Sequence, residues 1–294
     1  VFGALAYLNF KGEEEVLQAK EVEEKAREQA AAAPKPEDVT TLLGVDSLEL
    51  EIGYNLIPLV DANQGGDLLN RITLIRRQMA IDLGLIVPPI RIRDNIQLHP
   101  STYLVKIKGV EIEHYELIPD QFLAMNPGTV TSPVSGIEVK EPAFGLPAVW
   151  VPQSLRERAE LAGYTVVDPS TVIATHLTEI VRRNANEILG RQELQQLMDT
   201  VKLSDPLIVD EVVPKVISNS TLLKILQNLL REGVSIRNMR TILEALADCQ
   251  GINDVDTLTE AGDLGRYDYV IDTTGNSKAA AQLRERSQAT VLVM

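Results

Sequence analysis

The chain has little cysteine and few aromatic residues. Cys249 is its one cysteine, so an internal disulfide is excluded and a reducing compartment is indicated. Aromatic residues make up only 4% of the 294 residues, so aliphatic side chains must form most of the core. Hydrophobic residues amount to 45%, which is typical of a globular protein that buries substantial apolar surface.

The sequence also has no apolar run of about 18 residues, the length needed for a membrane-spanning helix. The first eight residues, VFGALAYL, are apolar but too short to cross a bilayer. Three interpretations of them stay open from the residues alone. They could be a core segment, the remnant of a signal peptide, or the end of a transmembrane helix that lies mainly upstream.

Positive charge is scarce as well. The formal net charge is −14 and the isoelectric point is about 4.8. Nucleic-acid binding depends on clustered Lys and Arg that displace counterions. We therefore expect no nucleic-acid partner.

The sequence also has no group of residues at the spacing that a catalytic or metal-binding site requires. His99, His114 and His176 have no His or Cys at metal-ligand spacing, and no Gly-x-Ser-x-Gly surrounds any serine. The Gly-rich turn at 63–67 lacks the Gly-Lys-Ser/Thr of a phosphate-binding loop, so Asp67 is interpreted as the N-cap of a helix. His176 is expected to be a packed residue. The sequence thus predicts no enzyme activity, no cofactor and no metal.

Periodicity divides the chain into an α+β part, a turn-rich part and a helical part. Residues 1–46 form an N-terminal stub and a linker, which is charged, Ala-rich and broken by prolines over 11–38. Alternating apolar residues then predict strands at 48–52, 90–93 and 103–107, with Gly109 permitting a bulge before 110–112. A helix is predicted over 67–83, ended by Gly84. These elements predict a mixed sheet covered by helices, in a domain over 47–119.

Residues 120–167 contain many turn formers, which predict a small β-rich subdomain with a helix at 155–161 and a strand at 164–167. The next helix has clear limits. Asp168 suits the N-cap and Pro169 the first helical position, and Gly190 is interpreted as a left-handed stop after Leu189.

From 190 to 248 apolar residues follow the helical period and predict a helical bundle, with helices at 194–201, 222–230 and 236–246 and Ser235 as the cap of the last. Residues 249–294 differ in pattern. A strand followed by a Gly turn over 269–276, a helix over 278–286 and another strand over 290–294 predict a C-terminal α/β piece.

The Pro- and Gly-rich segment 141–150 carries Phe144 and the one tryptophan, Trp150. It presents apolar and aromatic side chains on a stiff backbone and pairs no nucleophile with a base. This favours binding of another protein, since aromatic anchors contribute much of the energy of an interface. Simple core packing of Phe144 is the alternative.

Three strings, EPAFGLPAVW at 141–150, GYTVVDPSTVIATHL at 163–177 and GRQE at 190–193, resemble the cytoplasmic portion of the FlhA/InvA export gate family of type III secretion. The resemblance covers about 1–248. Residues 144–148 and 164–169 are more similar to flagellar members, and an injectisome (virulence) homologue is the alternative. Such proteins have a membrane-embedded half upstream, which favours the transmembrane interpretation of the first residues.

The resemblance implies a non-catalytic platform at the cytoplasmic face of the bacterial inner membrane. Its implied partners are flagellar export chaperones with their substrates, other export components including the export ATPase complex, and identical copies in a nonameric ring. Export would be driven by the proton motive force. The first domain is implied to resume over 168–189. After Asp248 the chain is expected to depart from the family, with a divergent, a truncated or a fused C-terminus as the open alternatives.

The resemblance also implies a chaperone-binding site, with Glu141 expected as a rim contact for a basic group; its residues are Glu141, Phe144, Val167, Val172 and Thr175. Three further family positions are given structural interpretations. Arg76 and Arg77 are expected to be surface charge, and Gly53 a requirement of the backbone.

Overall fold

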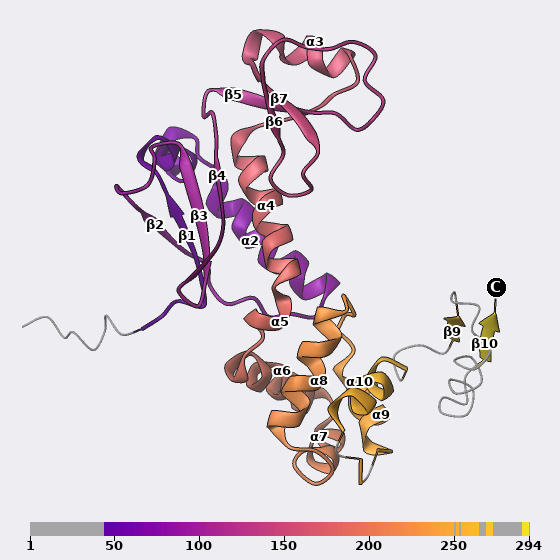
Figure 1. Cartoon of the computed structure of the whole chain (residues 1–294). Helices are drawn as coiled ribbons and strands as arrows, with labels where there is room; N and C mark the ends of the chain where they lie inside the picture. Colours follow the sequence, from indigo (N-terminus) through magenta and orange to yellow (C-terminus); the bar gives the residue numbers. More distant parts are fainter. Residues whose placement is uncertain (1–43, 250, 253, 265–268, 273–289, 294) are drawn as a thin grey trace, which may run out of the picture. The chain divides into compact units, whose positions relative to one another are not determined.

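The computed structural model describes residues 44–249, 251–252, 254–264, 269–272 and 290–293, shown as coloured ribbon in Figure 1. Nearly all of the predicted stub and linker, residues 1–46, lies outside this range. The part of the chain from Asp46 onward forms one compact unit. Within the described residues, none of the helices combines the length and apolar character that a membrane crossing requires.

The first sheet is mixed, as predicted. It contains β1 (Leu48–Ile52), β2 (Arg91–Asp94), β3 (Thr102–Ile107) and β4 (Val110–Glu116), in the order β2-β1-β3-β4. Strands β1 and β2 run parallel, and the other pairs are antiparallel. Strand β1 buries Leu48, Leu50 and Ile52, as the period-2 pattern predicts. Glu51 on its other face is also buried, where it forms an ion pair with Lys106.

The predicted bulge at Gly109 is wrong. Lys108 and Gly109 both have positive φ, 50° and 78°, and they form the turn of a β3–β4 hairpin. Two consecutive residues with positive φ match the twist of paired strands, so a hairpin is favoured there. The bulge lies instead between Val105 and Lys106.

Helices α2 (Leu68–Asp82), α4 (Pro169–Arg183) and the short α5 (Ala185–Ile188) contribute buried residues to the same core as this sheet. Two 3-10 turns, Tyr54–Leu59 and Ala62–Gln64, precede α2. Asp67 does not cap α2 as predicted, because its carboxylate accepts a hydrogen bond from Arg71 Nε at 2.7 Å instead. Gly53 approaches the backbone of His99 and Pro100 so closely that a Cβ there would clash, which confirms its backbone role.

A second sheet is built entirely from the predicted insertion. It contains β5 (Gln121–Met125), β6 (Ile137–Lys140), β7 (Pro147–Pro152) and β8 (Thr165–Val167), in the antiparallel order β6-β7-β5-β8. A 3-10 turn (Gln153–Leu155) and α3 (Arg156–Leu161) accompany it. The α+β fold class with an inserted β-rich subdomain is therefore confirmed.

The helical part contains α6 (Arg191–Ser204), α7 (Pro206–Val212), α8 (Asn219–Arg231), α9 (Met239–Ala247) and α10 (Val255–Leu264). Helices α7 and α10 were not predicted. Leu258 of α10 is fully buried in the core, and Thr259 of α10 accepts a hydrogen bond from Asn228 of α8. The helical part therefore continues beyond the predicted limit at 248.

Three predicted helix ends are wrong. The helix expected over 169–189 breaks at Asn184, whose side-chain amide donates to the Ile180 carbonyl at 2.7 Å. Gly190 is extended rather than left-handed, with φ −107° and ψ −170°, and its N–H donates to Glu193 at the start of α6. Asn238 rather than Ser235 caps α9, because its side chain accepts from Thr241 N–H.

Two short strands form a separate parallel pair, β9 (Tyr269–Asp272) and β10 (Thr290–Val293). Both lie within predicted strands. The helix predicted at 278–286 falls outside the described residues.

The end of α2 meets the start of the α9 region through backbone contacts. Ile236 N–H donates to the Leu83 carbonyl at 2.8 Å. Gly84 has φ +71°, and a Cβ there would meet the backbone of Arg237. A side chain at this position therefore faces both an unfavourable conformation and a clash with atoms that cannot rotate away.

We expect Gly84→Ala to lower the free energy of unfolding by about 2–4 kcal/mol, since strain from the positive φ adds to overpacking. Urea denaturation measures this loss. Gly65→Ala is the matched control, because Gly65 also has positive φ, +84°, with nothing within 4 Å of its Cβ position. The control should lose only about 1–2 kcal/mol, and equal losses in both variants would contradict the close approach at Gly84.

Candidate functional site

An apolar pocket of about 170 Å³ lies where the second sheet meets the start of α4. The structure brings all five predicted site residues together in its lining. The complete lining is Met125, Pro127, Glu141, Phe144, Leu146, Thr165, Val167, Val172 and Thr175. Residues from three separate segments thus converge on one hollow.

The α4 side of the pocket is fixed by the predicted N-cap. Asp168 is extended, and its carboxylate accepts from Thr171 N–H at 2.9 Å and from the Thr171 hydroxyl at 2.6 Å. Pro169 occupies the first turn, where its missing N–H is not needed. The helix then places Val172 and Thr175, three residues apart, on one face beside Val167 at the end of β8.

Arg71 of α2 joins the first domain to this helix start. Its guanidinium donates to the Thr171 hydroxyl at 2.7 Å and lies 3.4 Å from the Asp168 carboxylate. Burial raises the pKa of Asp168, but the hydrogen bonds from Thr171 and the charge of Arg71 together outweigh it. The pKa of Asp168 therefore lies below its ordinary value of 3.8.

Phe144 stands at the mouth of the pocket rather than in the core. The residue is 58% exposed, which rules out the alternative of simple core packing. The turn that carries it is closed by two backbone hydrogen bonds of 2.9 Å, from Gly145 N–H to the Glu141 carbonyl and from Glu141 N–H to the Leu146 carbonyl. Gly145 has φ +70°, which suits a residue without a side chain.

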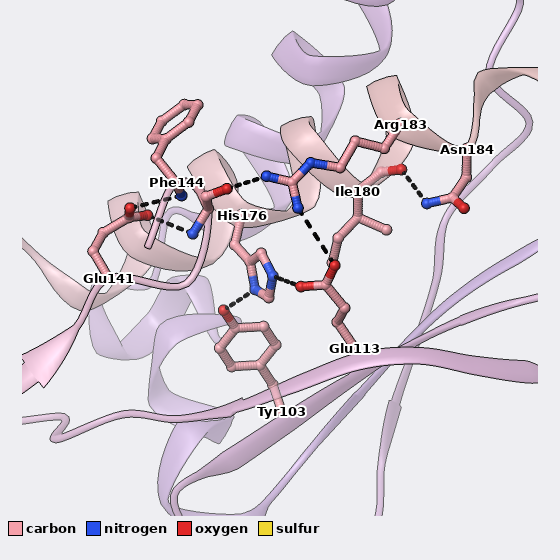
Figure 2. Close-up of polar contacts among 9 residues, drawn as sticks. Tyr103, Glu113, Glu141, Phe144, His176, Ile180, Arg183 and Asn184 are labelled. Carbon is pink, nitrogen blue, oxygen red and sulfur yellow. Dashed lines mark hydrogen bonds and ion pairs between the residues drawn. The ribbon is translucent and has the colours of Figure 1, made fainter. Parts of the chain in front are cut away.

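Glu141 is not the rim contact that was expected. It is only 3% exposed, and its two carboxylate oxygens accept from the backbone N–H groups of Ala143 at 2.6 Å and Phe144 at 2.9 Å. Figure 2 shows this carboxylate beside the turn. The side chain therefore shapes the turn from within, because a buried carboxylate needs hydrogen-bond donors.

The chemistry of the pocket suits recognition of an apolar group. Val172 is almost fully buried, whereas Phe144 and Leu146 are exposed at 58% and 41%. A side chain entering here would exchange water for contacts with valine, methionine and phenylalanine. Such contacts remove apolar surface from water, and this burial is the main source of binding energy at interfaces.

A buried polar cluster is centred on His176 of α4, one helical turn after the pocket residue Val172. His176 is packed, as predicted, at 1% exposure; its Nδ1 lies 2.7 Å from the Tyr103 hydroxyl and its Nε2 2.6 Å from Glu113 Oε2. Burial raises the pKa of Tyr103 well above its ordinary range, with smaller effects from nearby Tyr115, Glu141 and Glu113. The hydroxyl therefore keeps its proton, and the His176 ring lies between this hydroxyl and the Glu113 carboxylate, within hydrogen-bond distance of both.

No pattern in the sequence predicts this cluster. Tyr103, Glu113 and His176 come from β3, β4 and α4, and Arg183 at the end of α4 lies 3.5 Å from Glu113 Oε1. No local spacing signals such a group, since its members meet only through tertiary packing.

The family positions Arg76 and Arg77 differ from each other: Arg77 is exposed, whereas half-buried Arg76 donates to the Val87 carbonyl at 3.0 Å.

The sequence and the fold of this chain are similar to those of known proteins. The FHIPEP family matches residues 1–266, which reaches past Asp248, where a departure was expected. Flagellar biosynthesis protein FlhA of Bacillus subtilis (strain 168) is 48% identical over 261 residues, which is 88% of this chain. The chain spans 39% of the length of that relative.

Solved structures share the fold. The Chlamydia pneumoniae CdsV protein matches with a TM-score of 0.67 and 26% identity, over 79% of this chain and 67% of that one. Nonameric EPEC SctV-C matches with a TM-score of 0.58 and 24% identity, over 82% of this chain and 75% of that one. The second likeness concerns the fold alone.

Asp168→Ala should lower the free energy of unfolding by about 0.5–2 kcal/mol at pH 7, through loss of the N-cap. Asp168→Asn keeps an acceptor oxygen and should lose less. Because the folded pKa of Asp168 is lowered, its charge stabilises the fold above the unfolded pKa near 3.8, and this contribution is lost as the pH falls through the lower folded pKa. Urea denaturation of both variants and the wild type between pH 7 and pH 3 tests this. If the difference in stability between the wild type and the Asp168→Asn variant stays constant over that range, the expectation is contradicted.

Proposed function

The chain belongs to the FHIPEP family, and from that membership we propose that it is the cytoplasmic platform of a flagellar type III protein export gate. Its place would be the cytoplasmic face of the bacterial inner membrane, attached to a membrane-embedded half that precedes residue 1. Support comes from the 48% identity with a flagellar FlhA protein over most of the chain. An injectisome (virulence) export gate homologue is the second candidate, placed second because the 48% identity is with a flagellar protein.

Within this role we propose that the pocket docks chaperone–substrate complexes. The observation that carries the proposal is Phe144, an exposed phenyl ring at the mouth of an apolar hollow that contains all five predicted residues. Single exposed apolar residues are common on protein surfaces, but exposed apolar side chains that gather at a hollow, as Phe144 and Leu146 do here, are typical of an interaction site. An apolar side chain on a chaperone helix would enter the hollow against Val167, Val172 and Phe144.

The proposed platform performs no bond chemistry of its own. Docking would deliver cargo, and the proton motive force would drive export elsewhere in the apparatus. Other export components, including the export ATPase complex, are proposed partners on the same grounds of family membership. We also propose assembly into a ring of identical copies, for which the nonameric state of SctV-C is a structural precedent.

Phe144→Ala should weaken binding of a purified flagellar chaperone–substrate complex by about 1–4 kcal/mol, the range of an interface anchor. Isothermal titration calorimetry measures the dissociation constant. Leu161→Ala is the matched control, since Leu161 is an exposed apolar residue of the same subdomain, 88% exposed on α3 and absent from the pocket lining. A well-folded Phe144→Ala variant that binds like the wild type would remove the pocket from the proposed function.

A further inference from the structure

The turn that carries Phe144 is bound from the side of α4 by Arg183. This arginine is the last residue of α4, and its Nη2 donates to the carbonyl of Ala143. Ala143 itself is 1% exposed. Figure 2 shows the Arg183 guanidinium between the turn and Glu113. A charged side chain therefore reaches a buried backbone oxygen immediately before Phe144.

The carbonyl of Ala143 and the N–H of Phe144 belong to the same peptide unit. Arg183 binds the first of these groups, and Glu141 Oε2 binds the second at 2.9 Å. A planar peptide held at both of its polar groups cannot rotate without breaking one of them. Its orientation, together with the φ angle of Phe144, sets the direction in which the Cα–Cβ bond of Phe144 leaves the backbone. In Figure 2 the phenyl ring points away from His176.

Arg183 is in turn held by a carboxylate that the fold has already fixed. Its Nη1 lies 3.5 Å from Glu113 Oε1, and Glu113 Oε2 lies 2.6 Å from buried His176. His176 is anchored by the Tyr103 hydroxyl at 2.7 Å. The contacts therefore run from Tyr103 of β3 through His176 of α4 to Glu113 of β4. From Glu113 they continue to Arg183 at the end of α4 and then to the turn. Arg183 thus transmits the position of the first sheet to a turn of the inserted subdomain.

We infer that Arg183 is a positioning residue, which holds the peptide before Phe144 so that the ring stays at the mouth of the pocket. For docking, the inference rests on the proposed function. For the turn itself it does not, because the hydrogen bonds exist without any partner. Arginine suits the task because its planar fork can bind the carbonyl and the carboxylate together, whereas lysine offers a single point of donation.

The turn is tested first, in the protein without partner. Hydrogen exchange of the Ala143 and Phe144 amides, which Glu141 protects, should become roughly tenfold faster in Arg183→Gln, since loss of a charged donor to a buried carbonyl loosens the peptide. Arg183→Lys should show a smaller change. Arg182→Gln is the matched control: it removes the same charge from the neighbouring residue, which pairs with Asp82 and Glu179 instead. It should leave exchange in the turn unchanged.

Unchanged exchange in Arg183→Gln, or an equal rise in Arg182→Gln, would overturn the inference. Docking is then tested with the chaperone–substrate complex used for Phe144→Ala. We expect Arg183→Gln to weaken binding about three- to tenfold, and Arg182→Gln to bind like the wild type. If Phe144→Ala weakens binding and Arg183→Gln does not, the positioning role in docking is wrong. If neither variant weakens binding, the proposed docking at this pocket is wrong, and faster exchange in Arg183→Gln still supports the role of Arg183 in the turn.

Discussion

Helix α4 is the constraint on which both the core and the pocket depend. Ile173, Leu177 and Ile180 are fully buried in the main core, so the helix cannot shift without opening cavities among close-packed side chains. Val172 and Thr175 on the same helix form part of the pocket wall. The pocket therefore inherits its rigidity from the core of the first domain. Its other wall belongs to a sheet that the chain inserts between two parts of that domain.

Local signals in the sequence predicted the start of α4 correctly. Asp168 and Pro169 act through the first turn alone, and such short-range chemistry can be read from neighbouring residues. The alternating strands of the first sheet were predictable for the same reason. The set of pocket residues was also found, although it came from the family resemblance. Periodicity alone would not have joined Phe144 to Val172 and Thr175.

Features that depend on distant partners were not predicted. Gly190 was expected to adopt a left-handed conformation, but Glu193 binds its N–H and begins another helix there. Glu141 was expected to face solvent, but the folded turn supplies two N–H groups that draw its carboxylate inward. His176 meets Tyr103 across 73 positions of sequence. Each outcome depends on tertiary packing, which a reading of neighbouring residues does not contain.

The inward carboxylate of Glu141 has a consequence for selectivity. It is the one ionisable side chain among the described residues that line the pocket, and both its oxygens already accept backbone N–H groups. The pocket thus presents an apolar, shaped surface rather than a charged one to an incoming molecule. Recognition of this kind is nearly indifferent to ionic strength. If the pocket docks partners as proposed, it would also accept varied sequences that each place one apolar residue correctly, so that one surface could bind several different partners in turn.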